Sequence, residues 1–394
     1  MSKINVCFVS TYIPRQCGIA TYTDNLMKAI VSADNAHELQ LQVVAMNDKA
    51  GYEYSSEVKK QIDQNILTDY DRAADYINNS DIDVVSVQHE FGIYGGFNGR
   101  NLLRLLKKIK KPIVITLHTM PLKLDQPFKV NAKRHLSRSR LLRQIFEYTD
   151  GIAVMVEHSR DYLIKNFQVP SSKVFVIPHG ADEVSAETLA KYRNEKLVGI
   201  EKNDFLIVTF GLISPKKGLE YVIKSLPEIV AKNPGKKIKY LIAGRMHPMK
   251  GPEYIENLKK LARKLGVSEN IVFDTRYLSY EEIYRYLANA DIYITPYYVK
   301  EQSSSGTLSY ALSAGCCIVS TPYIFALEMV EKNKVGKLVE FRDSASISKA
   351  IDTLIKNSAQ MAEMRDNSWR TGREIAWPKI GEKFINLLKS IAKK

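Results

Sequence analysis

Three histidines stand at the ends of apolar runs that are typical of buried strands. His89 closes the run that begins at residue 83, His118 ends the run 112–118, and His179 follows the run 174–178. One histidine in such a place is usually structural, but three at strand ends indicate a polar site, because binding residues concentrate where strands end. None has the HxxxH spacing of metal ligands, so we predict contacts to a ligand and no metal.

The loop after His89 combines a carboxylate, aromatic rings and glycines. Glu90 is followed by FGIYGG, which contains Gly95. Imidazole and carboxylate groups can hydrogen-bond sugar hydroxyls, and an aromatic face can stack on the apolar face of a sugar ring. We therefore predict that His89, Glu90, Gly95 and the similarly placed His179 bind a saccharide. An ordinary surface loop is the alternative.

Cations follow two predicted strands in the second half of the chain. Lys217 lies in the loop after residues 205–210, and Arg245 lies directly after residues 239–244. A cation at a strand end suits a diphosphate, or the charge that develops on a departing phosphate. We interpret the neighbouring Lys216 as a solvated loop charge.

Two segments could bind an anion through backbone N–H groups. Gly18 precedes a helix expected near Thr21, and a helix N-terminus offers free N–H groups and the positive end of the helix dipole. A tight turn alone is the alternative for Gly18. The second segment is a Ser/Gly-rich loop that opens a helix, and its candidates are Ser304, Ser305, Gly306 and Thr307. The GxGxxG fingerprint is absent, which disfavours a nicotinamide enzyme.

These residues need two α/β domains to position them. Short apolar, β-branched runs alternate with amphipathic segments, a pattern typical of parallel strands buried on both faces. The predicted strands are 4–10, 41–46, 83–88, 112–118, 151–156 and 174–178, then 205–210, 239–244, 270–273, 291–296, 316–321 and 335–339. The pattern predicts two doubly wound Rossmann-like domains, residues 1–190 and 200–373, facing a cleft at the strand carboxyl ends.

Composition limits the class of protein. The 394 residues are 45% hydrophobic and 25% charged, as in ordinary globular chains, so disorder is excluded. Lys and Arg exceed Asp and Glu by 57 to 43, which favours a negatively charged partner. No nucleic-acid-reading motif accompanies the charge. The four cysteines form no disulfide framework, and no long apolar run occurs, so we predict a cytoplasmic protein.

Several blocks together resemble one enzyme family. They are TYIPRQCGIATY, VQHEFGIYGG, VITLHT, VIPHGAD, GLISPKKGLE, AGRMHP, ITPY, SSGTLSYALSAG and STPY. The sequence resembles the retaining glycosyltransferases of the GT-B fold, family four (group 1). The resemblance implies a nucleotide-sugar donor on the C-terminal domain and a saccharide acceptor on the N-terminal domain. It also implies a last helix, within 374–394, that crosses back to the first domain.

The sequence departs from the family pattern at phosphate- and nucleotide-binding positions. The family's phosphate-binding Arg is replaced by Leu212, although Arg245 could supply a charge. The paired glutamates of the family fall at Gln302 and Tyr310, or, with a shift of one residue, at Glu301 and Ser309. The second glutamate of that pair normally holds the nucleotide ribose. The resemblance therefore makes Glu301, Gln302 and Tyr310 candidate substrate-binding residues.

The sequence favours a transferase that moves a hexose from a nucleotide sugar of the GDP-mannose or UDP-glucose type to an acceptor hydroxyl. His118, Lys217 and Arg245 are the predicted catalytic residues, and no metal or other cofactor is expected, since no DxD pair ends a strand. A glycoside phosphorylase of the same fold, using phosphate or a sugar 1-phosphate, is the alternative that needs no ribose-binding glutamate.

A second alternative is a non-catalytic protein that binds anions or a membrane surface. Residues 129–143 carry six basic side chains and no acid, and the segment 102–111 reads LLRLLKKIKK. Basic amphipathic helices of this kind can make peripheral contact with anionic membranes. A solvated helix face is an equally good interpretation of the same residues.

Overall fold

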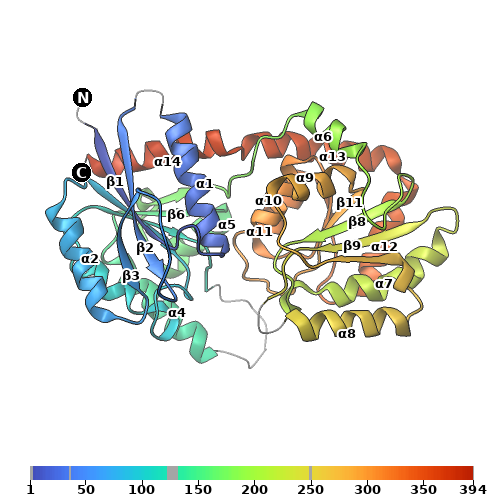
Figure 1. Cartoon of the computed structure of the whole chain (residues 1–394), viewed down its shortest axis with the longest axis horizontal. Coiled ribbons are helices and arrows are strands. Elements are labelled where there is room, and N and C mark those ends of the chain that lie inside the picture. The colour runs from blue at the N-terminus through green and yellow to red at the C-terminus, as the bar shows by residue number, and fades with distance from the viewer. Residues whose placement is uncertain (1–2, 35–36, 122–131, 248–250, 394) are drawn as a thin grey trace. The chain divides into compact units, whose positions relative to one another are not determined.

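The computed structural model describes residues 3–34, 37–121, 132–247 and 251–393, which form two compact units (Figure 1). Unit 1 comprises Met1–Gly180 and Trp377–Lys394, and unit 2 comprises Ala181–Ala376. The sequence placed these boundaries near residues 190, 200 and 374. Each unit is a parallel sheet covered by helices, so the predicted fold class of two doubly wound α/β domains is confirmed.

Unit 1 contains a seven-stranded parallel sheet in the order β3-β2-β1-β4-β5-β6-β7. The central strands β4 and β5 are buried at every residue, as expected for strands covered on both faces. The strands are β1 (Ile4–Ser10), β2 (Leu39–Asn47), β3 (Val58–Asp63), β4 (Val84–His89), β5 (Ile113–Leu117), β6 (Gly151–Val154) and β7 (Val174–Val176).

The sequence did not predict β3, because its residues VKKQID are mostly polar and exposed. The strand lies at the edge of the sheet and pairs with β2 alone. An edge strand with lysines toward solvent lacks the apolar run by which buried strands are recognised.

The helices of unit 1 cover both faces of its sheet. They are α1 (Gly18–Ala33), α2 (Leu67–Asn79), α3 (Leu102–Leu106), α4 (Ala132–Phe146), α5 (Glu157–Tyr162) and α14 (Trp377–Ala392), with shorter turns at Phe97–Gly99, Leu163–Phe167 and Ser171–Lys173.

The last helix, α14, returns to unit 1 and packs against α1 (Figure 1), as the sequence predicted. The two backbones are close, since a Cβ on Gly381 would lie 2.4 Å from the carbonyl oxygen of Ala29. The ring of Phe384 stacks near Phe8 of β1, with 6.4 Å between centroids. The indole of Trp377 lies against Gly180, where a Cβ would be 2.2 Å from the ring. The amphipathic tail is therefore part of the unit 1 core.

Unit 2 contains a six-stranded parallel sheet in the order β10-β9-β8-β11-β12-β13. The strands are β8 (Phe205–Phe210), β9 (Ile238–Ala243), β10 (Ile271–Asp274), β11 (Ile292–Thr295), β12 (Cys317–Ser320) and β13 (Gly336–Leu338). Each coincides with a predicted strand to within two residues.

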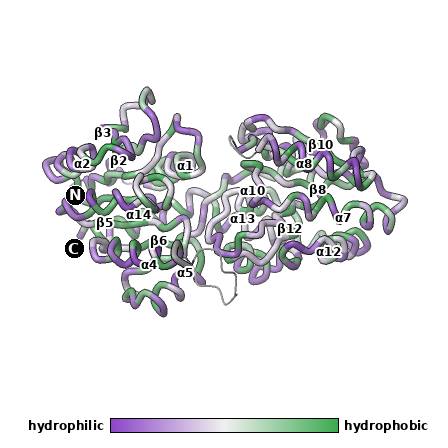
Figure 2. Tube along the Cα trace, turned by 90° about the horizontal axis from the view of Figure 1, so that it is seen from below, coloured by the Kyte–Doolittle hydropathy of each residue, from purple (hydrophilic) through white to green (hydrophobic). Residues whose placement is uncertain are grey.

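The helices of unit 2 supply much of its core. They are α6 (Ala186–Arg193), α7 (Leu219–Lys232), α8 (Gly251–Lys264), α9 (Tyr280–Asn289), α10 (Gly306–Ser313), α11 (Ile324–Ala326), α12 (Ser344–Lys356) and α13 (Ser358–Glu374), with turns at Pro215–Lys217, Ser268–Asn270 and Leu327–Glu331. In α7, Val222, Ile223 and Leu226 are fully buried, and each such side chain contributes about 1.5–3 kcal/mol relative to an exposed one. Pro227 lies inside α7, and the helix continues past it to Lys232. In Figure 2 the helical coils alternate between hydrophilic and hydrophobic colours, the mark of amphipathic helices on a sheet.

The strand orders define where ligands bind in each unit. In unit 1 successive strands are added on one side of β1 up to β3 and on the other side from β4 onward, so the strand order reverses between β1 and β4. In unit 2 the strand order reverses in the same way between β8 and β11. In open parallel sheets, ligands bind beyond the carboxyl ends of strands at this switch point. The segments that follow β1, β4, β8 and β11 are therefore the candidate site segments, and they contain most of the predicted residues.

Candidate functional site

Lys217 is the central cation at the switch point of unit 2. It ends the turn Pro215–Lys217 after β8, and its Nζ donates a hydrogen bond to Tyr297 Oη at 2.6 Å. Nζ also lies 3.8 Å from the centroid of the Tyr297 ring. Burial lowers the pKa of Lys217 to about 7. The side chain is thus partly neutral near pH 7, and an anion bound beside it would favour its charged form.

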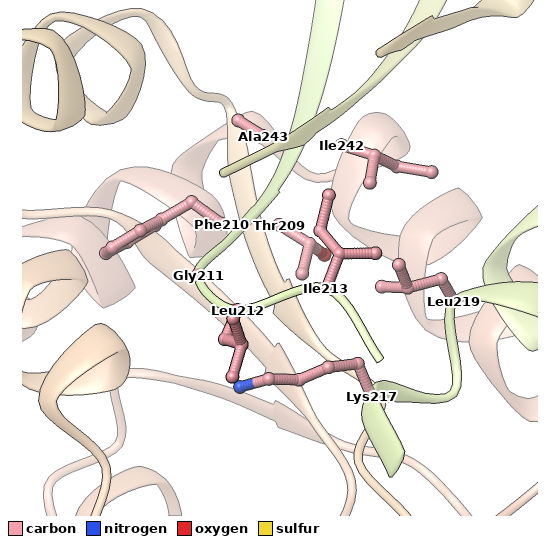
Figure 3. A pocket seen from close by; sticks show the side chains of 9 residues that line it. All are labelled: Thr209, Phe210, Gly211, Leu212, Ile213, Lys217, Leu219, Ile242 and Ala243. Atoms are coloured by element: carbon pink, nitrogen blue, oxygen red, sulfur yellow. The ribbon is translucent and has the colours of Figure 1, made fainter. Parts of the chain in front are cut away.

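The Lys217 side chain extends toward the Gly211–Leu212 turn and lines a small cavity beneath it (Figure 3). The cavity has a volume of about 10 Å³, room for one water molecule. A Cβ on Gly211 would lie 3.9 Å from Lys217 Nζ and 3.0 Å from the Thr307 methyl carbon. The glycine therefore leaves space in which these two side chains approach each other.

A glycine also fixes the turn that carries Lys217. Gly218 adopts φ +65°, and a Cβ there would lie 2.2 Å from the carbonyl oxygen of Pro296. Pro296 directly precedes Tyr297 in the segment after β11. The close approach of Gly218 to Pro296 therefore sets the Lys217 turn beside Tyr297, and a larger residue would separate them.

The N-terminus of α10 lies next to the Tyr297 hydroxyl. Ser305 caps the helix by accepting from the backbone N–H of Leu308 at 3.3 Å, and Thr307 Oγ1 lies 3.0 Å from Tyr297 Oη. The first N–H groups of a helix have no intrahelical partner and favour an anion. The structure thus brings together Lys217, Ser305, Gly306 and Thr307, as predicted for a phosphate site, although it does not test their role.

Three further predicted residues precede α10. Ser304 and Glu301 are half-buried in the loop, and the Gln302 side-chain amide donates to the Ser304 carbonyl oxygen at 3.0 Å. Gln302 is thus occupied by its own loop. Substrate contacts of these residues stay a prediction.

Arg245 follows β9, the strand beside β8, and its side chain is exposed. The loops after the two strands run together, since the Ile213 N–H donates to the Arg245 carbonyl at 2.9 Å and the His247 N–H donates to the Ile213 carbonyl at 2.9 Å. Arg245 therefore starts from the loop next to the Lys217 turn. Leu212, where the family has an arginine, is 48% exposed and contributes no charge.

Tyr310 lies on α10 within an aromatic cluster. Its ring meets Tyr280 and Tyr284 edge-on at centroid distances of 5.8 and 6.0 Å, and Phe210 lies 6.3 Å away. Its hydroxyl donates to Tyr280 Oη at 3.5 Å, and burial raises the pKa of Tyr310 well above its usual value. The group is therefore neutral and cannot replace the carboxylate of the family as a charged acceptor.

In unit 1, His118 lies immediately beyond β5. Its Nε2 is 3.0 Å from the side-chain oxygen of Gln88 on β4, and its ring meets Tyr22 of α1 edge-on at 4.6 Å. Burial, together with the nearby His179 and His89, lowers the pKa of His118 to about 3. At neutral pH the imidazole is therefore uncharged, suited to hydrogen bonding and poor as a proton acceptor.

His179 joins His118 around the same tyrosine. Its ring lies 5.1 Å from Tyr22 and 5.8 Å from Trp377, and its Nδ1 is 2.7 Å from the Gly180 carbonyl oxygen. Burial lowers the pKa of His179 to about 4. Two of the three predicted histidines are thus brought together.

Sequence reasoning missed Tyr22, Gln88 and Tyr297. For Gln88 a signal existed, because it directly precedes His89 at the end of β4. Tyr22 and Tyr297 gain their neighbours only through folding, and nothing local distinguishes them from core tyrosines.

His89 is a packing residue of its loop in the structure. The imidazole is fully buried, and it contacts Phe91 edge-on at 4.9 Å and stacks on Tyr94 at 6.3 Å. Neither ring nitrogen has a hydrogen-bond partner among the described residues. Burial, with Arg138 nearby, lowers the pKa of His89 to about 3. The predicted contact of His89 with a sugar is untested, and a ligand would need this cover to move.

The other predicted residues of unit 1 also have structural partners. Glu90 accepts from the Phe91 N–H at 3.0 Å and from the Thr119 hydroxyl. Gly95 has φ +62°, and a Cβ there would lie 1.8 Å from the Gln64 carbonyl oxygen, so the turn itself requires glycine. Gly18 begins α1 with open space around its Cβ position. Their substrate-binding roles stay predictions.

The basic segments are partly used within unit 1. The Arg138 guanidinium lies 4.3 Å over the Phe91 ring, and that of Arg143 lies 4.8 Å over Phe167. In the other segment Arg104 and Lys108 pair with Asp71. Residues 129–131 and the side chains of Lys133 and Arg134 lie outside what the structure describes. These contacts remove several of the cations that membrane contact was expected to use, and that contact stays a prediction.

Two kinds of feature are absent from the described residues. No group of three or more His, Cys, Asp or Glu side chains that could hold a metal ion occurs among them. None of the helices described here combines the length and apolar character needed to cross a bilayer.

Family models match most of each unit. Residues 17–184 match the model described as Glycosyltransferase Family 4, and residues 191–371 match the model described as Glycosyl transferases group 1. The first match lies mainly in unit 1 and the second lies in unit 2.

Two relatives have named activities. The D-inositol 3-phosphate glycosyltransferase of Corynebacterium efficiens is 24% identical over 293 residues, which cover 73% of this chain and 67% of the relative. The GDP-mannose-dependent alpha-(1-6)-phosphatidylinositol monomannoside mannosyltransferase of Mycolicibacterium smegmatis is 26% identical over 230 residues, or 57% of each protein. The matched part thus spans 57 to 67% of these relatives.

Two solved structures share the fold over nearly their whole length. Sucrose-phosphate synthase from Thermosynechococcus elongatus has a TM-score of 0.77 at 14% identity, covering 98% of this chain and 99% of that chain. HepE from Anabaena in complex with UDP-glucose has a TM-score of 0.73 at 15% identity, covering 98% of this chain and 100% of that chain. At these identities the likeness shows the fold.

Proposed function

This chain belongs to glycosyltransferase family 4, the group 1 glycosyltransferases with the GT-B fold, and from that premise we propose its reaction. It transfers a hexose from a nucleotide sugar to a hydroxyl of a saccharide acceptor, with retention at the anomeric carbon and without a metal ion. Two donor types have support, since one relative is named as GDP-mannose-dependent and one structural neighbour binds UDP-glucose.

One observation supports the proposed binding of the nucleotide-sugar donor. Lys217 and Thr307, at the N-terminus of α10, both hydrogen-bond to the hydroxyl of Tyr297. A diphosphate at this place would receive a charge-assisted hydrogen bond from Lys217 and backbone N–H bonds from Gly306 and Thr307. Departure of the nucleotide leaves negative charge on the diphosphate, and fixed donors lower the barrier by stabilising that charge. Arg245, which starts from the neighbouring loop, adds a second cation.

The proposed binding of the acceptor is based on the residues at the end of the unit 1 sheet, where His118 and His179 flank Tyr22. A neutral imidazole can form a hydrogen bond with a sugar hydroxyl without carrying a charge. His118 is proposed to contact the transferred sugar near the reacting carbon. Gly18 and Glu90, which follow β1 and β4, contact the acceptor in this proposal.

A glycoside phosphorylase is the second candidate, and Tyr310 is the observation that favours it. The residue expected to hold a ribose through a carboxylate is a neutral, buried tyrosine. An enzyme that uses phosphate or a sugar 1-phosphate has no ribose to bind, so it tolerates this replacement. Lys217 would serve the phosphate in either reaction.

Product analysis separates the two reactions. The protein is incubated with UDP-glucose or GDP-mannose and a panel of saccharide acceptors, and released UDP or GDP is measured. In parallel, glycosides are incubated with inorganic phosphate, and sugar 1-phosphate is measured. Acceptor-dependent nucleotide release with an unchanged anomeric configuration supports the transferase, and EDTA should not reduce it. Formation of sugar 1-phosphate from phosphate, without nucleotide use, would instead establish the phosphorylase.

A further inference from the structure

Among the described residues, the ammonium of Lys217 has one hydrogen-bond partner, the hydroxyl of Tyr297. Nζ donates to Tyr297 Oη, and the cavity around the side chain is walled by uncharged residues such as Phe210, Leu212 and Ile213. Within the described ranges, no carboxylate lies at ion-pair distance from Lys217. The position and charge of this lysine therefore depend on a tyrosine hydroxyl, not on an acid.

Tyr297 is itself held rigidly. The residue is 1% exposed, and its ring stacks on Tyr323 at 5.2 Å with an interplanar angle of 20°. Its carbonyl oxygen accepts from the Thr321 hydroxyl. Because neighbours fix both the backbone and the ring of Tyr297, the position of its hydroxyl is also fixed.

The hydroxyl of Tyr297 connects two parts of the site. An ammonium group can only donate, so Tyr297 Oη accepts from Lys217. The same oxygen lies 3.0 Å from Thr307 Oγ1, in a hydrogen bond that either hydroxyl can donate. Thr307 is the second residue of α10. This chain of hydrogen bonds directs the lysine toward the N-terminus of that helix.

We propose that Tyr297 is a positioning residue whose hydroxyl holds the Lys217 ammonium beside the N-terminus of α10, ready for the donor phosphate. The inference rests on the proposed function, because it assumes that a nucleotide diphosphate binds there. Removal of the hydroxyl takes away the acceptor that stabilises the charged lysine. Since burial already lowers the pKa of Lys217 to about 7, the lysine without this acceptor loses its proton at lower pH still.

The test compares Tyr297→Phe with the unmodified protein by calorimetric titration of UDP and GDP between pH 5.5 and 8.5. The variant keeps the ring under Lys217 and the stacking on Tyr323. At pH 5.5 the lysine is charged in both proteins, so their affinities should agree within about twofold. At pH 8.5 the variant should bind about tenfold more weakly, because a hydrogen bond to a charged group changes a pKa by about one unit. Protonation of the nucleotide phosphates affects binding to both proteins equally, so it cancels in the ratio of their affinities.

Tyr240→Phe is the matched control. Tyr240 is another fully buried tyrosine of unit 2, and its hydroxyl bonds to Thr209 at 3.0 Å. Its removal should leave the pH dependence of affinity unchanged. A uniform loss of affinity at all pH values in Tyr297→Phe, with no shift of the alkaline limb, would assign the hydroxyl a purely structural role and overturn the inference.

The outcomes also separate this inference from the proposed function. Nucleotide binding by the unmodified protein, together with a Tyr297→Phe profile that superimposes on it, overturns the inference alone. A failure of the unmodified protein to bind either nucleotide overturns the nucleotide-sugar proposal, and the role of Tyr297 falls with it.

Discussion

His118 and Gln88 are joined inside unit 1 by a contact of 3.0 Å between Nε2 and the side-chain oxygen. An amide oxygen only accepts, so the Nε2 of His118 carries the proton and Nδ1 keeps its lone pair. The ring is further fixed by Tyr22, which meets it edge-on. His118 is therefore a neutral, oriented hydrogen-bonding group at the carboxyl edge of the sheet.

The replacement His118→Ala should abolish most transfer while preserving donor binding. Loss of an oriented group at the reacting centre costs about a hundredfold in kcat, whereas the proposed nucleotide contacts lie in unit 2. Steady-state rates and calorimetry with the donor nucleotide measure the two effects. Loss of nucleotide binding in this variant would move His118 from the reaction to donor recognition.

The replacements Lys217→Ala and Arg245→Ala should each reduce turnover by about a hundredfold or more with the fold retained. Each removes a cation that is proposed to stabilise the leaving diphosphate. Lys216→Ala is the control, because Lys216 stands in the same turn but is exposed. Near-normal rates in both test variants would contradict the proposed role in phosphate binding. An equal loss in Lys216→Ala would mean that turnover depends on the total positive charge and not on these two positions.

The replacement Gly218→Ala should destabilise unit 2 and disturb the site together. The added Cβ meets the Pro296 carbonyl at 2.2 Å, and alanine is strained at φ +65°. We expect a loss of at least about 2 kcal/mol in unfolding free energy, measured by denaturant titration. Gly235→Ala, with no atom within 4 Å of the added Cβ, should change stability by less than about 1 kcal/mol.

Stability should fall as the pH drops below 6.5. His89 has a pKa of about 3 in the folded chain and an ordinary value of 6.5 when unfolded, so the unfolded chain binds the extra proton between these values. Burial of the neutral His89 side chain therefore contributes its full stabilisation above pH 6.5, and this contribution is lost as the pH falls toward 3. At pH 5 the loss is about 2 kcal/mol for this residue. His118 acts in the same direction.

The contribution of His89 can be isolated with His89→Leu. Denaturant titrations at pH 5 and 7.5 should show a smaller pH-dependent loss in this variant than in the unmodified protein. His37→Asn serves as the control, since His37 is exposed and asparagine tolerates its φ of +49°. An unchanged pH dependence in His89→Leu would mean that His89 titrates normally.

The parts of the fold that could be predicted from the sequence are those dominated by burial. Central strands such as β4 and β8 are continuous apolar runs, because helices cover both of their faces. The edge strand β3 escaped prediction, since a half-exposed strand carries lysines where a buried one carries valines.

The candidate site divides in the same way. Lys217 and His118 were recognised because Lys217 follows a predicted strand and His118 ends one. Tyr297, which contacts Lys217, stands 80 positions further along the chain. No local sequence pattern can predict a contact over that separation. Tyr297 reaches Lys217 only because Gly218 packs against Pro296 in the folded unit. His89, by contrast, occupied a position typical of a binding residue, and the structure gives it packing contacts.

The return of α14 to unit 1 has a consequence for the order of folding during synthesis. The first 180 residues leave the ribosome long before Trp377, yet α14 supplies Phe384, Leu388 and other buried side chains to their core. Until translation reaches the end of α14, the part of α1 around Ala29 that Gly381 packs against stays uncovered. Unit 1 is therefore completed after unit 2 has been made, and the nascent chain carries an uncovered apolar surface throughout that interval.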